Sequence, residues 1–183
     1  MSLTKDRQHT AYQALQERFG YKGPMRSPRV VRVVVSTGVG KKRSDPKQIE
    51  LIENRLARIT GQKSARRSAR LSIASFKLRE GETVGLQVTL RGARMYDFLD
   101  KLIHIALPRT RDFRGLSASA IDDMGNMTIG IREHTIFPET GDENLKDVFG
   151  LAVTIVTTAK SRDEAEAFLR HLGLPLRSGE LVK

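Results

Sequence analysis

The glycine-rich segment at residues 38–44, Gly-Val-Gly-Lys-Lys-Arg-Ser, has the composition of a phosphate-binding loop. It falls between a predicted strand and a predicted helix, where loops that hold nucleotide phosphates occur. A Walker loop, however, has four residues between its glycines and places Lys-Ser or Lys-Thr directly after the second glycine. Here one residue separates Gly38 from Gly40, and the glycine that the dinucleotide pattern requires three residues after Gly40 is absent. The segment therefore predicts a basic turn close to phosphate, with a phosphate-handling enzyme as the alternative.

The histidines and acidic residues form no catalytic or metal-binding pattern. His9, His104, His134 and His171 lack metal-ligand spacing, and the chain has no cysteine to assist them. Residues 122–126, Asp-Asp-Met-Gly-Asn, lack the ligand spacing and closing glutamate of a calcium loop and predict a turn. The sequence thus predicts a protein without catalytic residues, metal or cofactor, and it predicts that His104, on an apolar helix, is partly buried.

Positive charge is concentrated in the first part of the chain. The formal net charge is +11; residues 1–114 carry 25 Lys and Arg against 10 Asp and Glu, whereas residues 115–183 carry 7 against 11. A basic half is expected of a protein that binds a polyanion, because each neutralised phosphate releases counterions. A soluble basic protein without such a partner is the alternative. Binding to an anionic membrane is a weaker alternative. It requires a basic amphipathic helix with a wide exposed apolar face, and no segment of the sequence has this character.

The chain carries no sign of a membrane or secretory location. It has no apolar run of about eighteen residues, and no apolar signal core follows the charges at its start. The lack of cysteine fits a reducing compartment, so a cytoplasmic location is expected.

Apolar periodicity and capping residues predict helices and strands in a mixed order. Asp45 and Pro46 begin a helix that Gly61 ends, and Ser161 with Glu164 forms a capping box for the last helix. The expected helices are residues 2–19, 46–60, 93–107 and the segment between Ser161 and Gly173; the expected strands are 30–35 (buried), 84–91, 127–132 and 151–158; residues 63–73 are expected to be extended and residues 74–82 to form a loop.

Polar and apolar residues alternate along the segments 84–91 and 127–132. Such alternation gives a sheet one buried and one open face, so the sequence predicts a single α+β domain over residues 1–183. Its sheet is expected to be largely antiparallel, with helices packed on one face and an open side that faces RNA. Aromatic residues make up only 5% of the chain, which favours RNA bound by shape and backbone over stacked single strands. The open side would carry Gln87, Thr89, Arg91, Thr128 and Arg132, and the alternative is that these residues simply face water.

Several stretches of the chain occur together in a known family. Thr60-Gly61-Gln62-Lys63 and residues 72–81, Ser-Ile-Ala-Ser-Phe-Lys-Leu-Arg-Glu-Gly, are similar to its T-G-Q-K and S-I-A-x-F-K-L-R-x-G motifs. In order and spacing the stretches resemble the bacterial ribosomal protein L-five family over nearly the whole chain, and the combination is highly specific. The further matching stretches are residues 88–92, 95–99, 105–116, 137–139 and 154–159.

The resemblance implies a non-enzymatic constituent of the large ribosomal subunit that binds 5S rRNA and attaches it in the central protuberance. It also implies contact with 23S rRNA and with neighbouring large-subunit proteins of the central protuberance. An extended loop at residues 72–85 would contact P-site tRNA, and a bridge would reach a small-subunit head protein of the S-thirteen type. Residues 1–20 would form an N-terminal helix. A generic nucleic-acid chaperone remains an alternative.

When the family's RNA contacts are matched to this sequence residue by residue, the resemblance implies two sets of RNA-binding side chains. Ser36 stands where the family usually has asparagine, and its shorter side chain reaches less far. Phe76 meets the tRNA or anchors the loop to its own domain. The acidic stretch from Glu139 to Asp147 lies where the family approaches the bridge, with a solvated loop as the alternative. The implied 5S rRNA residues are Ser36, Gln62, Lys63, Arg66, Thr89 and Arg91, and the implied tRNA residues are Ser75, Phe76, Lys77, Leu78 and Arg79.

Overall fold

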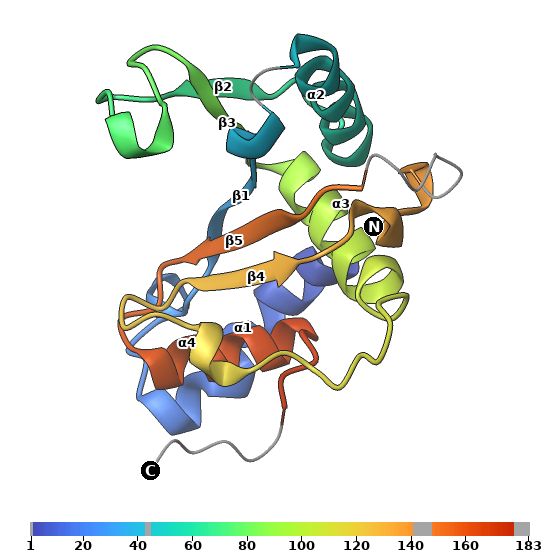
Figure 1. Cartoon of the computed structure of the whole chain (residues 1–183). Helices are drawn as coiled ribbons and strands as arrows, with labels where there is room; N and C mark the ends of the chain where they lie inside the picture. The colour runs from blue at the N-terminus through green and yellow to red at the C-terminus, as the bar shows by residue number, and fades with distance from the viewer. Residues whose placement is uncertain (1, 43–44, 141–147, 178–183) are drawn as a thin grey trace. The chain divides into compact units, whose positions relative to one another are not determined.

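The computed structural model describes residues 2–42, 45–140 and 148–177. These residues form α-helices and strands in the mixed order that the sequence predicts (Figure 1). The helices are α1 (Leu3–Phe19), α2 (Pro46–Thr60), α3 (Ala93–Lys101), which continues as a π-helical turn over Leu102–Ala106, and α4 (Arg162–Leu172); the strands are β1 (Val30–Gly38), β2 (Ala65–Ser68), β3 (Thr83–Leu90), β4 (Met127–Ile131) and β5 (Leu151–Thr157).

The strands form one antiparallel sheet in the order β2-β3-β1-β5-β4, which confirms the α+β class. Burial alternates along β5, where Leu151, Val153 and Ile155 are buried and the residues between them are half-exposed. The same alternation in β3 buries Leu86 and Val88. Because successive side chains of a strand point to opposite faces, one face of the sheet contributes to the core and the other stays open, as predicted.

The chain forms two compact units, each assembled from segments far apart in sequence. The first unit contains residues 1–33, 91–129 and 154–183, and the second unit contains residues 34–90 and 130–153. Strand β1 contributes residues to both units. The single domain expected over residues 1–183 therefore stays a prediction.

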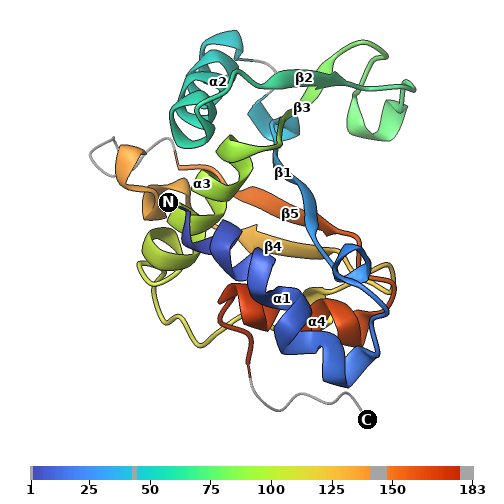
Figure 2. The ribbon, with the colours of Figure 1, turned by 180° about the vertical axis from the view of Figure 1, so that it is seen from behind.

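The first unit is built around the packing of α1 against α4 and α3, and Figure 2 shows α1 and α4 side by side. Gly20, with φ 62°, ends α1 in the left-handed conformation. At the other end of α1, the backbone N–H and the hydroxyl of Thr4 both donate to Asp100 Oδ1. Burial would raise the pKa of Asp100, but the hydrogen bonds from Ser2 and Thr4 outweigh it and lower the pKa below its ordinary value. The start of α1 is thus tied to α3 by an ionised carboxylate.

The second unit is organised by α2, whose ends follow local sequence signals. The Asp45 carboxylate accepts from the backbone N–H groups of Lys47 and Gln48, and Gly61, with φ 67°, ends the helix. One face of α2 is apolar and buried, as are the inward residues of β3. These buried side chains are Ile49, Ile52, Leu56 and Ile59 of α2 and Leu86, Val88 and Leu90 of β3.

Three local expectations differ from the structure. Residues 30–35 form a strand, but Val31 is exposed and Val34 is half-exposed, so the strand is not buried throughout. His104 is exposed because the π-helical turn places an extra residue in the helix and shifts its phase. The Glu164 carboxylate accepts from the backbone N–H of Lys160, one residue before the Ser161 cap, rather than closing the predicted reciprocal box.

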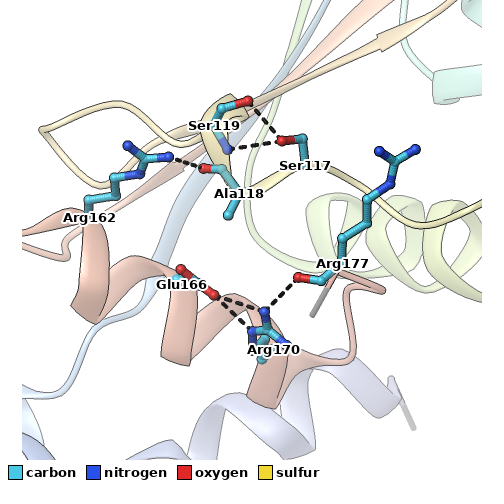
Figure 3. Close-up of polar contacts among 7 residues, drawn as sticks. All are labelled: Ser117, Ala118, Ser119, Arg162, Glu166, Arg170 and Arg177. Carbon is cyan, nitrogen blue, oxygen red and sulfur yellow. Dashed lines mark hydrogen bonds and ion pairs between the residues drawn. The ribbon is translucent and has the colours of Figure 1, made fainter. Parts of the chain in front are cut away.

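Arginines of the first unit hold its C-terminal segments together (Figure 3). Arg162 Nη2 donates to the Ala118 carbonyl at 3.0 Å, next to a turn in which the hydroxyls of Ser117 and Ser119 lie 2.8 Å apart. Arg170 donates to the Glu166 carboxylate and, through Nη2 at 2.9 Å, to the Arg177 carbonyl. Charge-assisted hydrogen bonds of this kind are stronger than neutral ones. These guanidinium groups have structural partners, so positive charge in this unit is not in itself an indication of RNA contact.

We expect Gly125→Ala to destabilise the protein more than Gly20→Ala. Both glycines have positive φ, which costs an L-residue about 1–2 kcal/mol. At Gly125 an added Cβ would also come within 2.8 Å of Ala159 Cβ and 2.9 Å of its carbonyl oxygen, whereas it would meet nothing within 4 Å at Gly20. Urea unfolding should show a loss of about 2–4 kcal/mol for Gly125→Ala and about 1 kcal/mol for Gly20→Ala. Equal losses would contradict the close contact at Ala159.

Candidate nucleic-acid interface

Gln62 and Lys63 lie directly after the end of α2 in the second unit. The Thr60 hydroxyl donates to the Leu56 carbonyl at 2.8 Å and lies 3.1 Å from the Gln62 carbonyl, which fixes the chain as it leaves the helix. Gln62 is half-exposed and Lys63 is exposed. A neutral donor–acceptor side chain and a cation therefore stand next to each other on a segment that α2 holds in place.

The pairing of β2 with β3 determines which way the next side chains point. The two strands are antiparallel, with Ala65 opposite Gln87, Arg66 opposite Leu86 and Arg67 opposite Gly85. Directly opposed residues lie on the same face of a sheet. Because Leu86 is buried, Arg66 lies on the face that carries the core, whereas Arg67 lies on the open face with Gln87.

Each of these arginines has a specific partner. Arg66 donates through Nε and Nη2 to Glu53 Oε2 of α2, at 3.2 and 2.9 Å. Glu53 is only 6% exposed, so the ion pair joins a buried carboxylate to a half-exposed guanidinium. Arg67 donates through Nε to Gln87 Oε1 at 2.7 Å. The family resemblance implies RNA contact at Arg66 and not at Arg67. The sequence does not show on which face either arginine lies; the strand register does.

Ser36, Thr89 and Arg91 lie on or next to the central strands. Ser36, on β1, is half-exposed and lines a shallow depression of about 480 Å³ together with Arg132 and Ala152. Thr89 is half-exposed on the same face of β3 as Gln87. Arg91 is exposed and directly follows β3, but it belongs to the first unit. The structure therefore gathers Ser36, Gln62, Lys63, Arg66 and Thr89 in the second unit.

The β2–β3 connection folds back on itself as a hairpin, visible beyond the two strands in Figure 1. Backbone hydrogen bonds join Ile73 and Leu78 in both directions, at 2.9 and 3.1 Å, around a short 3-10 turn at Ala74–Phe76. Lys77 has φ 49°, a left-handed conformation that is uncommon for a residue other than glycine. Strained backbone of this kind often occurs at functional positions. The tip exposes Ser75, Phe76 and Lys77, with Arg79 exposed and Leu78 half-exposed behind them.

Charge in this part of the second unit has one sign. Between residues 62 and 79 the chain has six Lys and Arg and no Asp or Glu. All six are exposed: Lys63, Arg66, Arg67, Arg70, Lys77 and Arg79. A cluster of exposed positive charges attracts a polyanion and orients it during approach.

The described residues offer less support for a catalytic or metal-binding site than for a nucleic-acid interface. Among the described residues, no group of three or more His, Cys, Asp or Glu is arranged to hold a metal ion. No helix in the described ranges is long and apolar enough to cross a membrane. Of the glycine-rich turn, residues 43 and 44 lie outside the described residues.

This protein is a basic α+β protein with an open sheet face, exposed cations and a protruding hairpin. These features are typical of the class of proteins that bind structured nucleic acid by shape and charge. Residues 23–79 match the family model described as ribosomal protein L5, and residues 83–176 match the model that describes the C-terminus of the same ribosomal family.

Individual relatives of the chain belong to the same ribosomal family. The chain is 50% identical to the large ribosomal subunit protein uL5 of Rubrobacter xylanophilus, over 97% of this chain and 99% of the relative. It is 51% identical to uL5 of Syntrophomonas wolfei, over 89% and 92%. The chain therefore belongs to the ribosomal protein L5 family of the large ribosomal subunit, which confirms the resemblance and the expected location in the ribosome. The family is one of ribosomal proteins rather than of enzymes.

We expect Phe76→Ala to leave the free energy of unfolding within about 0.5 kcal/mol of the unmodified protein. The reason is that Phe76 is 70% exposed at the hairpin tip, which argues against a role as an anchor to its own unit. Leu86→Ala, at a fully buried position of β3, should cost about 2–5 kcal/mol in the same urea titration. If Phe76→Ala lowered the free energy of unfolding about as much as Leu86→Ala, Phe76 would instead be an anchor of the hairpin to its own unit.

Proposed function

We propose that this protein binds 5S rRNA through the second unit and attaches it in the central protuberance of the large ribosomal subunit. The observation that carries the proposal is the set of half-exposed donor–acceptor side chains, Ser36, Gln62 and Thr89, on rigid elements beside exposed cations. Membership of a large-subunit protein family supports an rRNA partner. Contacts with 23S rRNA and with neighbouring proteins of the central protuberance belong to the same proposal.

The chemistry of these residues suits double-helical RNA. The wide, shallow minor groove of an RNA helix displays 2′-hydroxyls, which both donate and accept hydrogen bonds. Serine and threonine hydroxyls and the glutamine amide can do the same, whereas Lys63 supplies charge for phosphate. The contact expected at Arg91, which belongs to the first unit, stays a prediction. The open face of a sheet is flat enough to lie along such a groove, and its side chains are already ordered by the strands.

The hairpin at residues 72–85 is the proposed contact for P-site tRNA. Its tip presents a hydroxyl at Ser75, an aromatic ring at Phe76 and a cation at Lys77, with Leu78 and Arg79 behind them. The ladder between Ile73 and Leu78 gives the tip a defined shape. A contact on a hairpin can reach an RNA other than the one bound by the sheet face.

A bridge to a small-subunit head protein is the third part of the proposal. It concerns the acidic stretch at residues 139–147, of which residues 141–147 lie outside the described residues. Glu139, in the short 3-10 turn Pro138–Thr140, is exposed. Its negative charge suits a basic protein partner.

The proposal is tested by titrating the full chain against 5S rRNA in a filter-binding assay at two salt concentrations, with a structured RNA of equal length as competitor. A preference for 5S rRNA that survives the higher salt supports shape recognition. Equal binding of both RNAs that collapses with salt would identify a generic nucleic-acid chaperone and refute the proposal.

In that assay, Thr89→Ala should lower the affinity for 5S rRNA by about 1–2 kcal/mol, because a hydrogen bond in the interface is lost. Thr10→Ala is the matched control, since Thr10 is an exposed threonine whose hydroxyl donates to the Arg7 carbonyl within α1. It should leave the affinity unchanged. Equal affinity of the two variants would remove β3 from the proposed interface.

Lys77→Glu should spare 5S rRNA binding but weaken tRNA contact in reconstituted large subunits, measured as P-site tRNA retention. The reversed charge repels the tRNA backbone, and the hairpin tip is separate from the proposed 5S surface. Lys47→Glu, at an exposed position of α2, makes the same charge change outside the hairpin. A large loss of 5S rRNA affinity on Lys77→Glu alone would show that the hairpin belongs to the 5S surface.

A further inference from the structure

The neighbouring arginines Arg66 and Arg67 on β2 face opposite sides of the sheet, although only Arg66 was expected to bind RNA. Arg66 opposes the buried Leu86, and Arg67 opposes Gly85. The open face, where Thr89 lies, is therefore the face of Arg67 and not that of Arg66.

The Arg67–Gln87 pair is arranged to present hydrogen-bond donors. Arg67 Nε, a donor only, is bonded to Gln87 Oε1 at 2.7 Å, which fixes the amide orientation. That bond uses the acceptor of Gln87 and one N–H of Arg67. The remaining polar edge of the pair consists of the two Nη groups of the guanidinium and the amide Nε2 of Gln87, all donors. Such an edge selects acceptors, above all paired phosphate oxygens, which a guanidinium engages with two parallel hydrogen bonds.

The residue opposite Arg67 keeps this edge accessible. Gly85 has no side chain, so on the open face no side chain of β3 stands directly opposite Arg67. An added Cβ at Gly85 would lie 3.2 Å from the backbone oxygen of Thr37, which is tight. Glycine here allows close approach of backbone or ligand.

Arg66 serves a different purpose. Glu53 is almost fully buried, and a buried carboxylate needs a cationic or hydrogen-bonding partner. Arg66 meets it with Nε and Nη2 and thereby ties β2 to α2. Removing one member of such a pair leaves an uncompensated charge in the interior, which is strongly destabilising.

We propose that Arg67, oriented by Gln87, contacts phosphate of the bound RNA, and that Arg66 is a structural tie to Glu53. This assignment rests on the proposed binding of 5S rRNA by the second unit. It adds Arg67 and the positioning residue Gln87 to the interface and removes Arg66 from it.

The test compares Arg67→Ala with Arg66→Ala in the full chain, by salt-dependent titration of 5S rRNA and by thermal unfolding. The two substitutions delete the same side chain at adjacent positions. Arg67→Ala should weaken binding about tenfold or more, because its hydrogen bonds to a charged phosphate are lost. It should also reduce the slope of log affinity against log salt by about 0.7–0.9, the value for one phosphate contact. Its melting temperature should stay unchanged.

Arg66→Ala should lower the melting temperature by several degrees and leave the salt slope as in the unmodified protein, measured well below its melting temperature. Gln87→Ala provides a further readout. It should weaken binding about two- to fivefold by releasing the guanidinium, while the salt slope stays the same because the charge remains. A residue that acted only on stability would change the melting temperature instead.

The assignment is overturned if Arg66→Ala reduces the salt slope and Arg67→Ala does not, or if neither does while the unmodified chain binds 5S rRNA specifically. In the second case the proposed function stands and the inference alone fails. If the unmodified chain shows no preference for 5S rRNA over the competitor, the proposed function fails, and this assignment fails with it.

Discussion

The antiparallel register of β2 on β3 is the constraint on which the proposed interface depends. A strand offers its side chains alternately to two faces, so a register shift of one residue would exchange everything that β2 presents. The buried Leu86 fixes that register, because exposing it would remove a large apolar side chain from the core. The same burial therefore decides which polar groups face outward, and it links the hydrophobic core of the second unit to the chemistry of its surface.

Electrostatics in the second unit follows from this arrangement. The carboxylate of Glu53 is almost fully buried and needs a partner, which Arg66 supplies from the core face of β2. A cation on the open face remains hydrated until a ligand arrives, so its interaction energy is available for binding. Under the proposed assignment, two residues of the same type contribute to two different equilibria, folding for Arg66 and association for Arg67. The arginines at α4 of the first unit belong to the former group, because they satisfy backbone carbonyls and a neighbouring carboxylate.

The predictability of each element depended on how local its determinants are. The ends of α2 were predicted correctly from Asp45, Pro46 and Gly61, since capping acts within a few residues. The faces of residues 30–35 could not be predicted, because five of these six residues are valine and show no alternation of polar and apolar side chains. The exposure of His104 was mispredicted because a period of 3.6 residues does not anticipate a π-helical turn. The opposite faces on which Arg66 and Arg67 lie are set by a partner strand about twenty residues away, which only the folded chain reveals.

The register of β2 and β3 is interrupted between Arg67 and Ser68, because Arg67 opposes Gly85 whereas Ser68 opposes Thr83. Val84 is thus an additional residue on β3, and such a bulge bends the strand and re-aims whatever follows. Beyond the bulge the pairing continues with the register changed by one residue, because Ala69 exchanges backbone hydrogen bonds with Gly81 and Glu82. The bulge therefore separates the direction of the hairpin from the sheet surface. The hairpin can change direction while β2 and β3 present the same side chains before the bulge.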